Sequence, residues 1–266
     1  MAMSYLHGVR VKINRAKKHL ADLNLAIAAF KARGPHSFSI EIEPETGYEV
    51  YRFREREAIP SEWGAIIGDC VHNLRSALDL MANELVIANG GTPTQYTVFP
   101  IASSRERFYA RTIQAIDGVS DRAKWLIERL NPYEGGGGPL WRLHAIDIRD
   151  KHRLLIPVAA RHEMFFLRSH MLGPGYDHLP RAPRLGGTPI DRKFPLKEGD
   201  KLLIYNRPVP SSDFEDKTEF DFAFEIAFGE GQIFDGDPVL PTLHQLVDFT
   251  ESVIDVFARE IFCEAW

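Results

Sequence analysis

The sequence is poor in the features on which disulfide-stabilised, zinc-scaffolded and membrane-spanning proteins depend. It has two cysteines, Cys70 and Cys263, which are too few for a disulfide framework or a cysteine-rich zinc site. Its longest apolar run, residues 154–160, is seven residues long, whereas a membrane span needs about 18 to 20. Residues 1–18 carry charges where a secretory signal has an apolar segment, so we expect a cytoplasmic protein with no membrane partner.

What is present is a globular composition with an uneven distribution of charge. The 266 residues are 44% hydrophobic and 26% charged, which excludes disordered and low-complexity classes. Residues 213–266 hold fourteen acids and two bases, whereas residues 1–33 hold seven bases and one acid. A basic head and an acidic tail can attract each other within the fold, or the head can face an anionic partner. The net charge of −5 argues against nonspecific nucleic-acid binding, which depends on phosphate contacts.

Hydrophobic periodicity predicts a set of helices. Apolar residues recur at alternating spacings of 3 and 4 from Leu6 to Phe30, which indicates one long helix over residues 4–32. Because monomers seldom expose so long an apolar seam, this N-terminal helix is expected to pack along the C-terminal helix or to mediate self-association. The other predicted helices cover residues 61–88, 104–116, 121–130, 139–151 and 241–263.

Alternating apolar and polar residues predict antiparallel strands. Residues 38–42 and 48–53 flank a short turn and read as a hairpin, and residues 220–228 form the clearest strand of the second half. Shorter strands are expected in the 154–159, 164–169 and 202–206 segments. Residues 173–195 contain nine glycines or prolines and are expected to form a long exposed loop.

These elements predict an α+β fold in which a helical bundle packs with an antiparallel β-sheet. Because helices and strands interleave along the chain, residues 1–266 are expected to form a single compact domain. Its bundle would come mainly from residues 1–33, 60–151 and 238–264, and its β-rich parts from residues 37–56 and 154–235.

The helix at 61–88 carries an unusual polar stripe opposite its apolar face. A solvated helix face is normally rich in lysine and glutamate, and this stripe has neither. One interpretation is the wall of a site, with His72 and Asp79 as acid/base groups and Asn73 and Arg75 as ligand-binding groups. The other is a polar network between helices, with Arg75 paired to Asp79. The members of the stripe, at spacings of 3, 4, 3 and 4, are Asp69, His72, Ser76, Asp79 and Asn83.

A second polar cluster follows the glycine run at 135–138 and occupies residues 144–153. If the helix continues, His152 interrupts an apolar stripe formed by Trp141, Ala145, Ile148 and Leu155, as either a core histidine or an acid/base group. We expect Asp150 and His152 to be catalytic and to converge with His72 and Asp79. Arg149 and Arg153 are then placed to bind an anion.

No motif requires a cofactor. The sequence has no HExxH zinc motif, no Gly-x-Ser-x-Gly elbow and no phosphate-binding Gly-Lys-Ser/Thr loop. A mixed histidine and carboxylate site can hold Mn²⁺, Fe²⁺ or Zn²⁺, although nothing in the sequence demands one. The residues available for such a site are Asp69, His72, Asp79, Asp150 and His152.

Short motifs within residues 60–157 occur in a specific order. They are IIGD at 66–69, HNLRSALD at 72–79, FPI at 99–101, NPY at 131–133 and DKHR at 150–153. Together they resemble the signature of a bacterial and phage protein family that has no assigned reaction. The resemblance implies a bacterial or phage origin and a fold whose helices bring the two polar clusters together.

The predicted bundle is also similar to HEPN-type helical proteins, many of which cleave RNA without metal through an arginine and a histidine separated by four to six residues. No histidine of this chain has an arginine at that spacing, and the interval from Arg149 to His152 is too short. Two function classes therefore stay open. One is a HEPN-like nucleic-acid-processing or defence-type effector that uses His152 or His72. The other is a non-catalytic binding or sensing module for a small anionic ligand or a protein partner.

Overall fold

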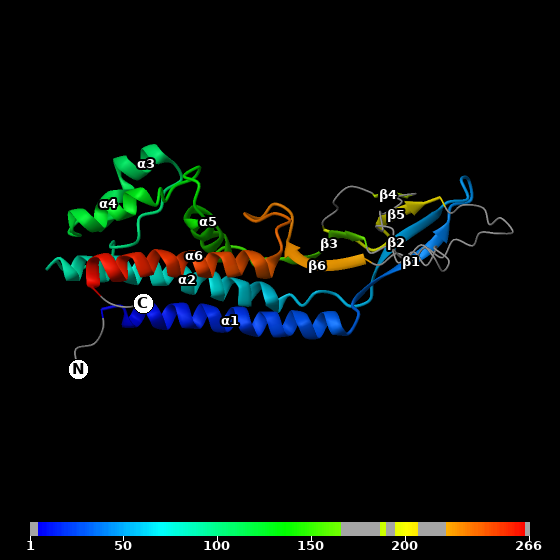
Figure 1. Cartoon of the computed structure of the whole chain (residues 1–266), viewed down its shortest axis with the longest axis horizontal. Helices are drawn as coiled ribbons and strands as arrows, with labels where there is room; N and C mark the ends of the chain where they lie inside the picture. The colour runs from blue at the N-terminus through cyan, green and yellow to red at the C-terminus, as the bar shows by residue number, and fades with distance from the viewer. Residues whose placement is uncertain (1–4, 166–186, 190–194, 207–221, 264–266) are drawn as a thin grey trace, which may run out of the picture.

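The computed structural model describes residues 5–165, 187–189, 195–206 and 222–263. The molecule is elongated, with the helices gathered at one end and a β-sheet at the other (Figure 1), which confirms the α+β prediction. The helices are α1 (His7–Ala32), α2 (Glu62–Ala88), α3 (Arg105–Ala110), α4 (Asp121–Arg129), α5 (Leu140–Asp150) and α6 (Val239–Phe257), with short 3₁₀ and π turns at Thr112–Ile116 and Ala258–Phe262. The strands are β1 (His36–Ile42), β2 (Glu49–Glu55), β3 (Pro157–Phe165), β4 (Gly187–Pro189), β5 (Lys201–Tyr205) and β6 (Phe222–Phe228).

The apolar seam of α1 is covered within the chain. Every member of the seam from Leu6 to Phe30 is buried. The α1 helix runs antiparallel to α2, since Leu80 is the nearest neighbour of Gly8 while the Phe30 ring contacts Trp63. It also contacts α6, the expected C-terminal neighbour, so burying the seam requires no second copy.

The strands form two antiparallel sheets. The predicted hairpin is confirmed as β1 and β2, and it belongs to a four-stranded sheet of order β1-β2-β5-β4. A separate pair, β3 and β6, lies between this sheet and the bundle (Figure 1). The expected strands at 154–159 and 164–169 are one continuous strand as far as Phe165, and residues 166–169 lie outside the described residues. Most of the expected loop at 173–195 also lies outside them, and β4 occupies part of it.

The buried residues form two clusters. The larger fills the helical bundle and includes Ile226 and Phe228 of β6. The smaller lies on the four-stranded sheet around Tyr51 and Phe53, and Ile59 packs against both clusters. None of the described helices combines the length and apolar character that a membrane crossing needs. The bundle therefore presents α2 and α5 side by side, and the polar groups of interest lie where these two helices meet.

Candidate functional site

Two glycines of α2 allow the chain beyond α5 to lie directly against the helix. A β-carbon at Gly68 would collide with the carboxylate of Asp150, and one at Gly64 would collide with the carbonyl oxygen of Leu155. The end of α5 and the turn after it therefore run along α2 at van der Waals distance. This contact brings together the two polar segments found in the sequence.

The centre of the site is Asp147 of α5, whose side chain is only 3% exposed. Its Oδ1 lies 3.0 Å from Nδ1 of His72, and its Oδ2 accepts a hydrogen bond of 2.6 Å from Nζ of Lys151. Because an ionised carboxylate only accepts, the Nδ1 of His72 must carry the proton. The other ring nitrogen, Nε2, is then a lone-pair acceptor, 3.4 Å from the hydroxyl oxygen of Ser76.

The His72 ring is held at its inner edge and open at its outer edge. Its side chain is 51% exposed, in contrast to the buried Asp147 beneath it. A histidine with one nitrogen fixed by a buried carboxylate and the other facing solvent can take up and release a proton in a fixed orientation. This arrangement is a geometry for acid/base chemistry or for holding a hydrogen-bonding ligand.

Arg75 and Asp79 both form hydrogen bonds with the backbone of Phe99, an arrangement called the Phe99 clamp below. Arg75 donates to the Phe99 carbonyl oxygen at 2.9 Å, and the Phe99 N–H donates to the Asp79 carboxylate at 2.8 Å. The two side chains also pair with each other at 2.7 Å, and Arg75 Nε donates to Nδ1 of His144 at 3.3 Å. Arg75 is 6% exposed, so its guanidinium is committed to internal partners rather than to a ligand in solvent.

The pKa shifts in this cluster follow from burial and from the neighbouring charges. Burial, with Arg75 nearby, lowers the pKa of His144 to about 4, so this imidazole is neutral at pH 7. Burial also lowers the pKa of Arg75 and raises that of Asp79. The pKa of Asp150 is raised by burial and then by the carboxylates of Asp147 and Asp69.

Four predicted site residues remain, three at the end of α5 or just after it and one on α2. Arg149 is half-buried in the last turn of α5, and His152 and Arg153 are exposed in the turn that follows. The expectation that His152 interrupts an apolar stripe is wrong. The helix ends at Asp150, and it buries Leu140, Leu143 and Ile146 instead, because α5 has apolar side chains on more than one face. Asn73 is half-buried, and its amide donates to the Asp69 carbonyl oxygen at 2.7 Å.

Three of the four residues expected to converge lie around Asp147, which belongs to the second polar cluster but was not among the predicted site residues. His72, Asp79 and Asp150 all lie close enough to Asp147 to interact with its charge or bond to it. No described contact joins the His152 side chain to this group. The signal that could have identified Asp147 is its position four residues after Leu143 and seven after Leu140, a spacing that puts an acid on the same helix face as two apolar residues.

The site also extends towards α1. Burial, reinforced by Arg15, lowers the pKa of His19, and Asp69 of α2 opposes that shift. His19 is half-buried on the face of α1 that meets α2. The apolar periodicity of α1 predicts a packing element only, and it gives no indication that polar residues of this helix lie near the site.

Metal binding has no preformed geometry among the described residues. No group of three or more histidine, cysteine, aspartate or glutamate side chains there is arranged to hold a metal ion. The five residues proposed for a mixed site are divided, since Asp79 is engaged by Arg75 and the Phe99 N–H, and His152 lies in the exposed turn. The carboxylate with a histidine partner is instead Asp147.

Comparison with known proteins identifies no relative: no family model, no curated protein and no solved structure matches this chain.

Proposed function

We propose that the protein is an enzyme that carries out acid/base chemistry on an anionic substrate at the junction of α2 and α5. The observation that carries this proposal is the His72 ring, fixed through Nδ1 by buried Asp147 and half exposed at its other edge. In this role His72 Nε2 removes a proton from an attacking hydroxyl or water. Asp147 holds the ring and stabilises the imidazolium that forms, without itself being protonated.

The cationic residues at the end of α5 and in the turn after it support an anionic substrate. The Lys151 side chain is 52% exposed, and its ammonium group forms an ion pair with Asp147. Arg149 and Arg153 lie two residues before and after it in the same segment. A phosphodiester fits these groups, because lysine and arginine donate to phosphate oxygens. We therefore propose nucleic acid as the substrate class, with His72 rather than exposed His152 as the acid/base group.

We also propose an origin and a cellular role, on the basis of contacts between the sequence motifs. The Phe99 clamp joins the HNLRSALD and FPI motifs, and the Asp150–Gly68 contact joins the DKHR and IIGD motifs. Motifs that touch one another are what a family built around this site would share. This supports a bacterial or phage cytoplasmic protein, HEPN-like in its bundle and acting as a nucleic-acid-processing or defence-type effector.

Cleavage of a labelled single-stranded RNA by wild type and by histidine variants tests the proposal. We expect His72→Gln to lower the cleavage rate by about 10²-fold or more, the usual contribution of a positioned acid/base group. His152→Gln should lower it less than about tenfold, since no described contact joins its side chain to the Asp147 group. His244→Gln, at an exposed position of α6, is the matched control. Equal rates for His72→Gln and wild type, at equal melting temperatures, would contradict the proposal.

The alternative function is a non-catalytic binding or sensing module. It is favoured by the second bond of Asp147, because Lys151 draws on the same carboxylate that orients His72. A carboxylate shared between two donors suits a stable anion-binding surface as well as a proton-transfer site. Retention of intact RNA or inorganic phosphate by wild type, lost in a Lys151→Met variant and without any cleaved product, would support this function.

A further inference from the structure

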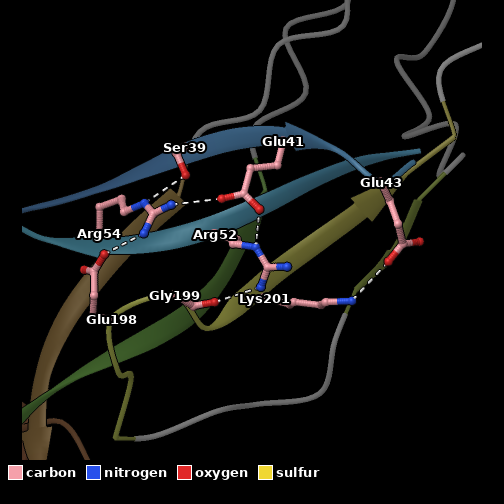
Figure 2. Close-up of polar contacts among 8 residues, drawn as sticks. All are labelled: Ser39, Glu41, Glu43, Arg52, Arg54, Glu198, Gly199 and Lys201. Atoms are coloured by element: carbon pink, nitrogen blue, oxygen red, sulfur yellow. Dashed lines mark hydrogen bonds and ion pairs between the residues drawn. The ribbon is translucent and has the colours of Figure 1, made fainter. Parts of the chain in front are cut away.

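The two faces of the β1 strand differ: the charges on one face are paired, whereas the other face exposes apolar side chains. On the polar face, ion pairs satisfy the charges, and Figure 2 shows the side chains of β1, β2 and the segment leading into β5 meeting in pairs. Glu41 accepts from Arg52 at 2.6 Å and from Arg54 at 2.9 Å, and Glu43 pairs with Lys201 at 3.4 Å. This face needs nothing further to neutralise its charge.

The opposite face of β1 leaves large apolar side chains in solvent. Ile40 is 51% exposed and Ile42 is 60% exposed, although Tyr51 and Phe53 on the same face of β2 are buried. Ile40 lies directly opposite Tyr51 in the β1–β2 register. The apolar surface of this sheet therefore continues past its core to the β1 edge and stops there uncovered.

The β1 strand is also an edge of its sheet, and the backbone groups of Ile40 and Ile42 have no partner among the described residues beyond it. Glu43 donates its N–H to the Tyr48 carbonyl, and the regular register places Glu41 and Ser39 on the same bonding side, towards β2. Ile40 and Ile42 therefore point their N–H and C=O groups away from β2. No hydrogen bond joins these groups to any described residue.

The strand lacks the usual protections of an exposed edge. It is seven residues long, contains no proline or lysine, and pairs with β2 without a bulge. Free backbone groups beside exposed isoleucines form a surface that another strand can extend.

We propose that β1 is the interface with a second copy of this chain, which adds its own β1 in antiparallel orientation about a two-fold axis at Ile40. In this register Ile40 faces Ile40 of the other copy, while Glu41 faces Ser39 and Glu43 faces Ser37. A parallel, in-register pairing would set Glu41 against Glu41, which is unfavourable. Of these two pairings, the antiparallel one centred on Ile40 is therefore the one that keeps the glutamates apart.

The two four-stranded sheets become one continuous sheet in this dimer, with the isoleucines packed across the new junction. The inference is independent of the α2–α5 site, which lies in the bundle, away from the β1 edge (Figure 1). It also replaces α1 as the self-association surface, because the α1 seam is already buried against its own chain.

Mass measurement by light scattering on the full chain tests the interface. Wild type should have twice the 30.2 kDa chain mass, and Ile40→Lys and Ile42→Lys should each dissociate to single chains at the same concentration. Leu25→Lys, at a 69% exposed position of α1, is the matched control and should stay dimeric. Circular dichroism confirms that all three variants are folded. The proposal is overturned if wild type keeps the mass of a single chain at a concentration about 100 times a micromolar dissociation constant. A dimeric Ile40→Lys would overturn it as well.

Cysteine cross-linking tests the register. In a Cys263→Ser background, Ile40→Cys should form an interchain disulfide, since directly opposed residues have Cα atoms about 5.5 Å apart. Ser37→Cys should not, because its two copies are about 20 Å apart in this register. Cross-linking of Ser37→Cys as fast as Ile40→Cys would show that the strands do not pair about Ile40.

Discussion

At the scale of single residues, one buried carboxylate organises the candidate site. Asp147 is reached by His72 from α2 and by Lys151 from its own segment, so it connects the two polar clusters through direct bonds. A buried carboxylate of this kind is expensive unless every oxygen is bonded, and here each oxygen has a partner. The orientation of His72 is therefore a consequence of how Asp147 is satisfied.

The neutral state of His144 predicts a pH dependence of stability. Its pKa is about 4 in the folded protein and near 6.5 when unfolded, so the unfolded chain binds more protons between these values. Stability from this group is full above about pH 6.5 and is lost as the pH falls towards 4. Allowing for partial solvent screening, we expect a loss of about 1 to 2 kcal/mol.

Urea unfolding at pH 7 and at pH 5 measures this effect, with His144→Gln as the comparison. The variant should lack the part of the pH slope that belongs to His144, while the raised pKa values of Asp79 and Asp150 contribute equally to both proteins. Identical slopes for wild type and His144→Gln would mean that folding does not lower the pKa of His144.

The Phe99 clamp predicts that Arg75 matters for folding rather than for ligand binding. Arg75→Ala leaves Asp79 without its partner and the Phe99 carbonyl without its donor, which should cost about 3 to 5 kcal/mol. Arg122→Ala breaks an exposed pair with Glu260 and should cost about 1 kcal/mol or less. Denaturant unfolding of both variants measures the difference. Equal small losses would place Arg75 outside the stabilising network.

At the scale of elements, α2 is the helix on which the molecule is built. It buries residues against α1, α5 and α6, and it also carries the polar groups of the site. Its glycines are the feature that makes both roles compatible, because they let the Asp150–Leu155 segment approach without displacing the helix. The spacing of Gly64 and Gly68, one turn apart, places both on the face towards α5.

Gly68→Ala therefore should disturb the site before it unfolds the bundle. The new methyl group collides with the Asp150 carboxylate, which must move away from α2 together with its segment. We expect a loss of stability of about 1 to 3 kcal/mol, as for overpacked positions, and a change in the His72 NMR signals. Gly138→Ala is the control, since a β-carbon there has ordinary contacts only. Unchanged His72 signals in Gly68→Ala would refute the close approach.

The elements themselves were largely predictable, because apolar periodicity records which faces are buried. The α1 seam and the β1–β2 hairpin appear as expected. The buried face of α5 could not be predicted from the sequence, because this helix has apolar residues on more than one side. The contact with α2 decides that Leu143, Ile146 and Asp147 are the buried residues. A local pattern cannot make that choice when two faces are similarly apolar.

At the scale of the whole molecule, the uneven charge distribution is matched by packing. The basic α1 helix and the acidic α6 helix are in contact, and Lys17 pairs with Glu251 at 2.7 Å. Of the two expectations for the basic head, attraction to the tail is thus the one with a direct contact. An ion pair exposed to solvent contributes little to the free energy of unfolding. The opposite charges of α1 and α6 therefore favour the pairing of these two helices more than they stabilise the folded protein.

The site could be predicted in its location but not in its internal roles. Two polar segments on separate helices were enough to expect that they meet. The structure brings His72, Asp79 and Asp150 near Asp147, whereas no described contact joins the His152 side chain to them. Whether a polar residue points into the site or into the protein depends on long-range contacts. Arg75 and Asp79 point at the Phe99 backbone, a partner twenty or more residues away that no helical spacing reveals.

The tautomer of His72 tests the central claim most directly. Long-range nitrogen–proton NMR at about pH 8, where ordinary imidazoles are neutral, distinguishes Nδ1–H from Nε2–H. The signal is assigned by its loss in His72→Gln. The account predicts the Nδ1–H tautomer in wild type, in which the ring donates this proton to the Asp147 carboxylate and Nε2 carries the lone pair. This preference should be lost in Asp147→Ala. A wild-type ring with its proton on Nε2 would show that Asp147 does not hold His72 for proton transfer.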